Sequence, residues 1–222
     1  MLKVVVFDSG YGGELFADKL EQDLPIVEVI RVIDWRHADQ IQSSPRKARK
    51  LAEVALRPYI GRVDLIIFAN YLLGATSLRY FERHYENQKF IGLSLKVPDS
   101  PIKRNTLILA TGPITKTIAY QTFLLRTKRK TKTLVLDDWP AKIDDGELNK
   151  TEICRTLESF STKSRLYPGE VVLACTHFND FKPILHDIFG RNLKVYDSFN
   201  DAVSEVCRAL KIRGGTGRKA KI

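Results

Sequence analysis

Short apolar runs alternate with longer amphipathic segments along most of the chain, and this alternation constrains the fold more than any other feature. The runs have the length and the β-branched content of buried strands, whereas the segments between them have helical spacing. Strands that alternate with helices form parallel sheets with crossover helices, so the sequence predicts an α/β fold. The expected strands are 4–7, 27–33, 65–69, 90–95, 106–110, 133–136, 171–174 and 193–196. The expected helices are 14–23, 45–59, 77–86, 116–125, 150–160, 180–189 and 200–210.

A break near the middle of the chain divides this pattern. Pro98, Pro101 and the polar residues between them interrupt it, and a new cycle of strands and helices follows. We predict two similar lobes, each a parallel sheet flanked by helices, with an active-site cleft between them. The first lobe is expected to comprise residues 1–96 plus 198–213 and the second residues 97–197. Residues 214–222 are expected to form a disordered basic tail.

Charge and cysteine content bear on the partners of the protein. The 222 residues carry a formal net charge of +10, with basic clusters at residues 126–132 and 206–222. No aromatic residues interleave with these clusters to stack on bases, so we expect solvated segments and no nucleic-acid partner. No apolar stretch reaches the length of a membrane span, so no membrane partner is expected. Three cysteines without framework spacing favour a reducing cytoplasm.

Polar residues stand directly after several of the expected strands. Ligands bind at the carboxyl ends of strands in open parallel sheets, so these residues predict one shared cleft. They are Asp8, Ser9, Asn70, Thr111, Thr115, Thr117, Cys175, Thr176, His177, Asp197 and Ser198. For the last two, helix capping is the favoured interpretation. Gly10, Gly12 and Gly13 allow the backbone to approach a ligand closely, although their spacing is not that of a dinucleotide-binding loop.

The run of Cys175, Thr176 and His177 after an apolar strand is the most informative part of this set. Helix capping explains the threonine but not the cysteine. A Cys–His dyad is one interpretation. Residues that leave a strand tend to point apart, so the two side chains need not touch. No spacing of carboxylates, histidines and cysteines indicates a metal site.

These motifs together resemble the aspartate/glutamate racemase superfamily, and glutamate racemase most closely. Residues 7–13 are similar to the opening motif of the family, and residues 173–178 to its second cysteine motif. Residues 110–120 are similar to the threonine-rich turn that opens its second lobe. Residues 143–146 loosely match an acidic turn, and residues 196–198 the late strand end. The matches span almost the whole chain in the order of the family.

The resemblance implies a cofactor-independent isomerase of amino-acid metabolism that supplies the peptidoglycan cell wall. In that family two cysteines on opposite faces of an acidic amino acid exchange its α-proton. The resemblance assigns catalysis to Cys175, Asp8 and His177, with no metal and no cofactor. It assigns binding of an acidic amino acid or related carboxylic acid to Ser9, Asn70, Thr111, Thr115 and Thr176. A homodimer is the candidate assembly.

The sequence departs from the family pattern at the position of the first catalytic cysteine. Ala69 stands there, immediately before Asn70, and a methyl group cannot exchange a proton. Tyr71 and Leu72 replace small hydroxyl residues, which predicts a bulkier and more apolar pocket. The substrate-binding turn after the second strand is also missing from residues 34–39.

These departures leave several functions open. One is a divergent racemase in which another group, such as Tyr71 or a water molecule, replaces the lost thiol; such a tyrosine would need a lowered pKa. A second is a one-cysteine decarboxylase or isomerase of malonate-type acids. A third is a binding relative without turnover, and a nucleic-acid role is the weakest alternative.

Overall fold

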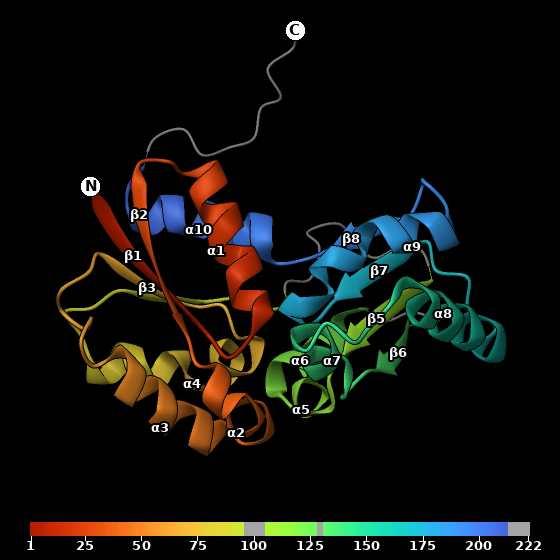
Figure 1. Cartoon of the computed structure of the whole chain (residues 1–222), viewed down its shortest axis with the longest axis horizontal. Helices are drawn as coiled ribbons and strands as arrows, with labels where there is room; N and C mark the ends of the chain where they lie inside the picture. Colours follow the sequence, from red (N-terminus) through yellow and green to blue (C-terminus); the bar gives the residue numbers. More distant parts are fainter. Residues whose placement is uncertain (96–104, 128–130, 213–222) are drawn as a thin grey trace, which may run out of the picture.

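The computed structural model describes residues 1–95, 105–127 and 131–212, which form two α/β lobes side by side (Figure 1). The first sheet has the strand order β2-β1-β3-β4, and the second has the order β6-β5-β7-β8. All neighbouring strands in both sheets are parallel. The strands are β1 (Leu2–Asp8), β2 (Val27–Ile33), β3 (Leu65–Phe68), β4 (Phe90–Gly92), β5 (Thr106–Ala110), β6 (Thr131–Val135), β7 (Glu170–Leu173) and β8 (Lys194–Tyr196). The predicted fold class, with two similar lobes, is confirmed.

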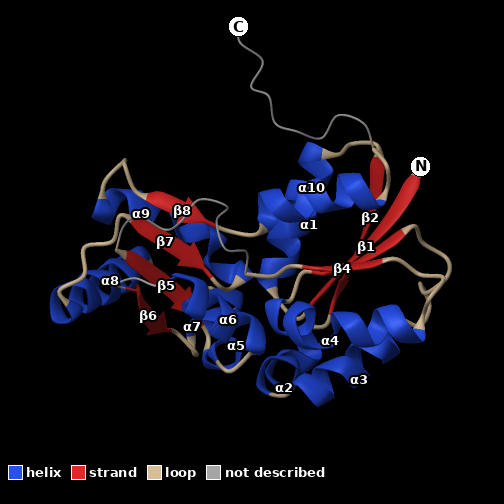
Figure 2. Cartoon of the chain, turned by 180° about the vertical axis from the view of Figure 1, so that it is seen from behind, coloured by secondary structure: helices blue, strands red, loops and turns tan. Residues whose placement is uncertain are grey.

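Helices cover both faces of each sheet, as Figures 1 and 2 show. The helices of the first lobe are α1 (Tyr11–Asp23), α2 (Ala38–Ser43), α3 (Pro45–Leu56), α4 (Tyr71–His84) and α10 (Phe199–Ala209), with a 3-10 turn η1 (Trp35–His37). Those of the second lobe are α5 (Gly112–Thr115), α6 (Ile118–Thr127), α7 (Trp139–Asp144), α8 (Lys150–Ser164) and α9 (Lys182–Phe189), with a 3-10 turn η2 (Thr176–Phe181). The chain leaves β8 and returns to the first lobe, where α10 lies beside α1 (Figure 1).

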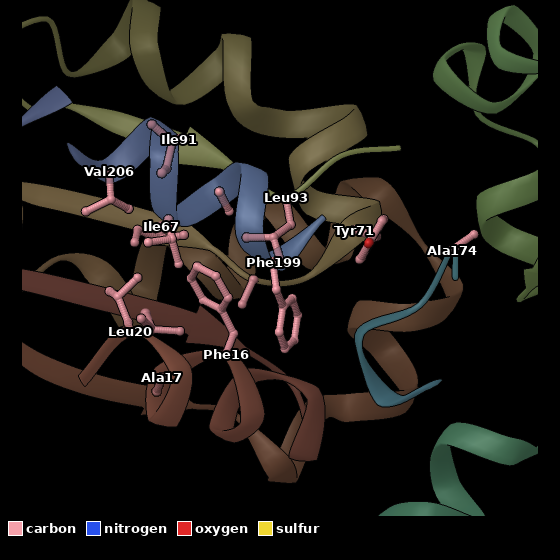
Figure 3. Close-up of a cluster of buried hydrophobic side chains, with 14 of the residues drawn as sticks. Phe16, Ala17, Leu20, Ile67, Tyr71, Ile91, Leu93, Ala174, Phe199 and Val206 are labelled. Atoms are coloured by element: carbon pink, nitrogen blue, oxygen red, sulfur yellow. The ribbon is translucent and has the colours of Figure 1, made fainter. Parts of the chain in front are cut away.

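Alternate residues of the central strands point to opposite faces of the sheets and build separate layers of the core. Val5 and Phe7 of β1 pack with α2, α3 and α4, whereas Val4 and Val6 face α1 and α10. This second layer continues into the other lobe, where it includes Ala174 and residues of α6. Figure 3 shows Tyr71 between the first-lobe part of this cluster and Ala174. The two lobes therefore share one apolar cluster.

Every predicted strand and helix is present, but several boundaries were wrong. The helix expected at 77–86 begins at Tyr71, because the Asn70 side chain accepts a hydrogen bond from the Leu73 amide and caps it there. The strand expected at 90–95 ends at Gly92. The helix expected at 180–189 begins at Lys182, because η2 occupies the preceding residues.

Smaller boundary shifts affect the other five predicted helices, of which the one expected at 116–125 spans Ile118–Thr127 and the one expected at 200–210 spans Phe199–Ala209. The helix expected at 14–23 begins at Tyr11, the one expected at 45–59 ends at Leu56, and the one expected at 150–160 continues to Ser164. The short helices α2, α5 and α7 were not predicted, because their four to six residues carry no clear helical period. The predicted tail at 214–222 lies outside the described residues.

Candidate active site

The carboxyl ends of the central strands from both lobes meet where the lobes face each other. β1 ends at Asp8, and β3 is followed by Ala69 and Asn70. In the second lobe, β5 is followed by Thr111, and β7 by Ala174 and Cys175. Cys175 still has extended backbone, and η2 begins at the next residue, Thr176. The transition from strand to turn thus places the thiol at the carboxyl end of the sheet, as the sequence predicts.

Cys175, His177 and Asp144 form a continuous chain of polar contacts. The sulfur of Cys175 lies 3.5 Å from Nδ1 of His177, and Nε2 of the same imidazole lies 3.1 Å from Oδ1 of Asp144. Oδ1 of Asp144 also accepts a hydrogen bond of 2.9 Å from the Tyr11 amide of the other lobe. The 3-10 geometry of η2 turns His177 back toward Cys175, so the two side chains do touch.

The surroundings of His177 favour the imidazolium form. The side chain is buried, and burial alone would lower its pKa. The Cys175 sulfur and the Asp144 carboxylate outweigh this effect and raise the pKa of His177 well above its ordinary value. An imidazolium stabilises a neighbouring thiolate. The arrangement therefore places a cationic donor beside the thiol of Cys175.

The Asp8 carboxylate forms hydrogen bonds with residues of both lobes. Its Oδ1 accepts hydrogen bonds from the Ser9 amide at 2.6 Å and from Nδ2 of Asn70 at 3.1 Å, and its Oδ2 lies 3.5 Å from the Thr176 hydroxyl. Asn70 also donates to the Ser9 hydroxyl. The carboxyl group is fully buried, and burial raises the pKa of Asp8. Asp8 thus holds the loops that carry Asn70 and Thr176.

Close backbone approach explains the glycines of the first loop. A Cβ at Gly12 would collide with the side chain of Thr176, and a Cβ at Gly10 would lie 2.8 Å from Nε2 of His177. Only glycine therefore allows the start of α1 to pack against η2 of the other lobe. These glycines therefore allow the two lobes to come into close contact at the site.

A cavity of about 40 Å³ opens beside Cys175 and lies between the lobes. It has room for about three water molecules, so an amino acid enters only if the lobes part or the cavity widens. The residues around it are Gln42, Asn70, Tyr71, Leu72, Thr111, Pro113, Ile114, Pro140, Ala174, Cys175, Thr176 and His177. The predicted cleft between lobes is thus present.

Only some of the predicted site residues line this cavity. Asn70, Thr111, Cys175, Thr176 and His177 do so. Asp8 and Ser9 are fully buried and do not line it, but both accept hydrogen bonds from Asn70, which does. The Thr115 hydroxyl is committed to the carbonyl oxygen of Gly112 at 2.7 Å, and Thr115 does not line the cavity.

Tyr71 lines the cavity, but the prediction that it could replace the lost thiol as a base was wrong. Its hydroxyl lies 2.7 Å from the Ser198 hydroxyl and donates to the carbonyl oxygen of Leu173 at 3.3 Å. Burial raises the pKa of Tyr71 far above the range of a base that works at neutral pH. Ala69 is fully buried in the shared cluster and does not line the cavity.

Asp197 and Ser198 have structural roles. Asp197 accepts a hydrogen bond of 2.7 Å from the Phe199 amide at the start of α10 and forms an ion pair of 2.6 Å with Lys182. Ser198 bonds Tyr71. The favoured interpretation of helix capping holds for Asp197.

The positions of Asp144 and Gln42 at the site were not predicted from the sequence. Asp144 was noted only within a loosely matching acidic turn, and its separation of 33 residues from His177 gave no spacing signal. Gln42 lies on a short helix that the sequence did not predict. Among the described residues there is no cluster of three or more His, Cys, Asp or Glu side chains that could hold a metal ion. Within the same residues, no helix is long and apolar enough to span a membrane.

Known proteins resemble the chain over nearly its whole length. The glutamate racemase of Ruegeria pomeroyi is 23% identical over 90% of this chain and 81% of its own. That of Bifidobacterium adolescentis is 24% identical over 94% of this chain and 84% of its own. The crystal structure of Escherichia coli glutamate racemase, in complex with L-glutamate and the activator UDP-MurNAc-Ala, superposes with a TM-score of 0.77. It is 20% identical, and the match covers 99% of this chain and 86% of that one.

The chain has the glutamate racemase fold. No protein-family model matches it. The resemblance to glutamate racemases that the motifs predicted is confirmed in sequence and in structure. Within this racemase fold, Cys175, His177 and Asp144 lie where the two lobes meet.

Proposed function

We propose that this chain is a racemase-like enzyme that moves a proton at the α-carbon of an acidic amino acid or related carboxylic acid, without a cofactor. The observation that carries the proposal is the chain from Cys175 through His177 to Asp144 at the wall of a cavity between the lobes. The racemase relatives and the shared fold support the same class of reaction.

The thiol of Cys175 is the group that we assign to proton transfer. Nδ1 of His177 faces the sulfur at 3.5 Å, and an imidazolium in that position stabilises a thiolate. The thiolate takes the α-proton: an S–H bond forms, the C–H bond breaks, and the electron pair moves into the substrate carboxylate. Thr111 has a hydroxyl with no hydrogen-bond partner in the described part of the chain, so it is free to bind that carboxylate.

We propose that the reaction proceeds from one face of the substrate. Ala69 occupies the position where the resemblance predicts the other catalytic cysteine. The Tyr71 hydroxyl is hydrogen-bonded to Ser198 and to the carbonyl oxygen of Leu173. With one thiol, the proton returns from the side on which it was removed. The expected outcome in deuterated water is exchange at the α-carbon with retention of configuration.

Deuterium exchange tests this proposal directly. Each enantiomer of glutamate, aspartate and glutamine is incubated with the protein in deuterated water, and loss of the α-proton signal is followed by NMR. Exchange should disappear in Cys175→Ala and persist in Cys154→Ala, which removes a thiol on α8 outside the cavity. Exchange of neither enantiomer of any of these three amino acids would count against the proposal.

Decarboxylation of a malonate-type acid is the second candidate, and the apolar cavity wall with a single thiol favours it. There a C–C bond breaks, carbon dioxide leaves, and the Cys175 thiol protonates the resulting enolate. Carbon dioxide release from substituted malonates would identify this reaction. Thermal stabilisation by a ligand without exchange or decarboxylation would instead indicate a binding relative.

We propose a homodimer as the assembly and a reducing compartment, such as the cytoplasm, as its location. A working thiolate must remain reduced, and the three cysteines of the described structure are all free thiols. Light scattering of the purified protein tests the assembly, and a monomer at micromolar concentration would contradict it.

A further inference from the structure

A second hollow of about 410 Å³, the outer hollow, shares a lining residue with the reaction cavity. Its walls come from η1 and α2 of the first lobe and from α7 of the second. Gln42 lines both hollows, and Asp144, on the outer wall, contacts His177, on the inner wall. Gln42 therefore lies at the junction between the two hollows.

The amide of Gln42 is free to bind a ligand. Its side chain makes no hydrogen bond with any described residue, although it is half-buried and lies against the cavity. An amide carries two donor hydrogens and one acceptor oxygen. A half-buried amide without a protein partner can hydrogen-bond a substrate group that reaches the junction.

The walls around Gln42 do not favour a negatively charged group. No lysine or arginine lines the reaction cavity among the described residues, and its one imidazolium, that of His177, is paired with Asp144. Several of its walls are apolar, including Leu72, Ile114 and Pro140. In the outer hollow, the carboxylates of Asp39 and Asp145 outnumber the one guanidinium, that of Arg36. A substrate carboxylate at the junction would lose water and face this excess of negative charge.

We infer that Gln42 contacts the side chain of the substrate and that this side chain is uncharged. The inference rests on the proposed function, and it narrows the substrate class from acidic amino acids to related carboxylic acids with a neutral, hydrogen-bonding side chain. Gln42 contacts the substrate away from the reacting carbon, so it determines specificity and takes no part in the proton transfer.

Matched substrates and variants test this inference. Glutamine and glutamate differ only at the end of the side chain, and the α-proton of glutamine should exchange at least about tenfold faster. Gln42→Met has a similar length without the amide, and it should remove most of this preference by raising the KM for glutamine. Gln42→Lys should instead favour glutamate. Gln40→Met is the control, because Gln40 is exposed on the same helix and lines neither hollow.

Two outcomes would overturn the inference. One is faster exchange of glutamate than of glutamine by the unmodified protein, and the other is an unchanged ratio in Gln42→Met. If no substrate exchanges at all, the proposed function fails, and thermal shifts then decide the inference separately. Stabilisation by glutamine that is lost in Gln42→Met would support it, and the absence of any glutamine-specific shift would contradict it.

Discussion

His177 and Asp144 lie 33 residues apart in sequence, yet Nε2 of the imidazole is 3.1 Å from Oδ1 of the carboxylate. Asp144 comes from the end of α7 and His177 from η2. The Tyr11 amide at the start of α1 holds the same carboxylate oxygen. One carboxylate thus joins the first lobe to the histidine that contacts Cys175.

Replacement of Asp144 should therefore change the pH dependence of the reaction. Asp144→Asn removes a charge that raises the pKa of His177, so the imidazolium is lost at lower pH. Exchange should fall about a hundredfold at neutral pH, and the basic limb of the pH–rate profile should move to lower pH. Asp201→Asn is the matched control, because Asp201 is exposed on α10 and lines neither hollow. Identical profiles for the two variants would contradict the assignment.

The stabilisation that Asp8 contributes to the fold should decrease as the pH rises. Burial raises the pKa of Asp8 above 3.8, so the folded protein keeps a proton that the unfolded chain has already released. The resulting stabilisation is present below the unfolded pKa and is lost as the pH rises through the folded pKa. In urea unfolding, the stability of the native protein relative to Asp8→Asn should decrease with pH across that window. Parallel stability curves would show that the Asp8 pKa is not raised.

Tyr71→Phe separates a structural role of the hydroxyl from a catalytic one. The substitution removes the hydrogen bonds to Ser198 and to the carbonyl of Leu173, at a cost of about 1–2 kcal/mol in the free energy of unfolding. Exchange should continue within about threefold of the native rate, because a group with a raised pKa is a poor base. Complete loss of exchange in a folded variant would restore Tyr71 as a base.

Gly12→Ala tests the close contact between the lobes. The added methyl group would collide with the side chain of Thr176, so the variant should lose about 1–3 kcal/mol of stability and most of its exchange activity. Gly112→Ala is the control, because its methyl group would meet only the carboxylate of Asp137 at 3.0 Å, and that exposed side chain can move. Equal effects in thermal unfolding would mean that the Gly12 contact does not matter.

The sequence predicted the strands and the location of the thiol because both are local properties. Apolar β-branched runs identify β1 and β7 directly, and a cysteine after such a run must lie at the carboxyl end of the sheet. The start of α4 was missed because Tyr71 favours strands and Gly74 weakens a helical pattern, whereas the Asn70 cap decides the boundary.

The parts that were not predicted depend on side-chain directions and on tertiary packing within the second lobe. Whether His177 reaches Cys175 depends on the 3-10 geometry of η2, and whether it reaches Asp144 depends on how α7 packs. Likewise, the sequence assigns Thr115 to the site, but its hydroxyl bonds the local backbone. Residue type and order do not determine such side-chain directions.

Deuterium incorporation into separate enantiomers in deuterated water is the most direct test of a single thiol that acts from one face. The account predicts that one enantiomer exchanges its α-proton and keeps its configuration, and that Cys175→Ala abolishes the exchange while Cys154→Ala does not. Interconversion of both enantiomers at comparable rates, or exchange that survives in Cys175→Ala, would contradict it.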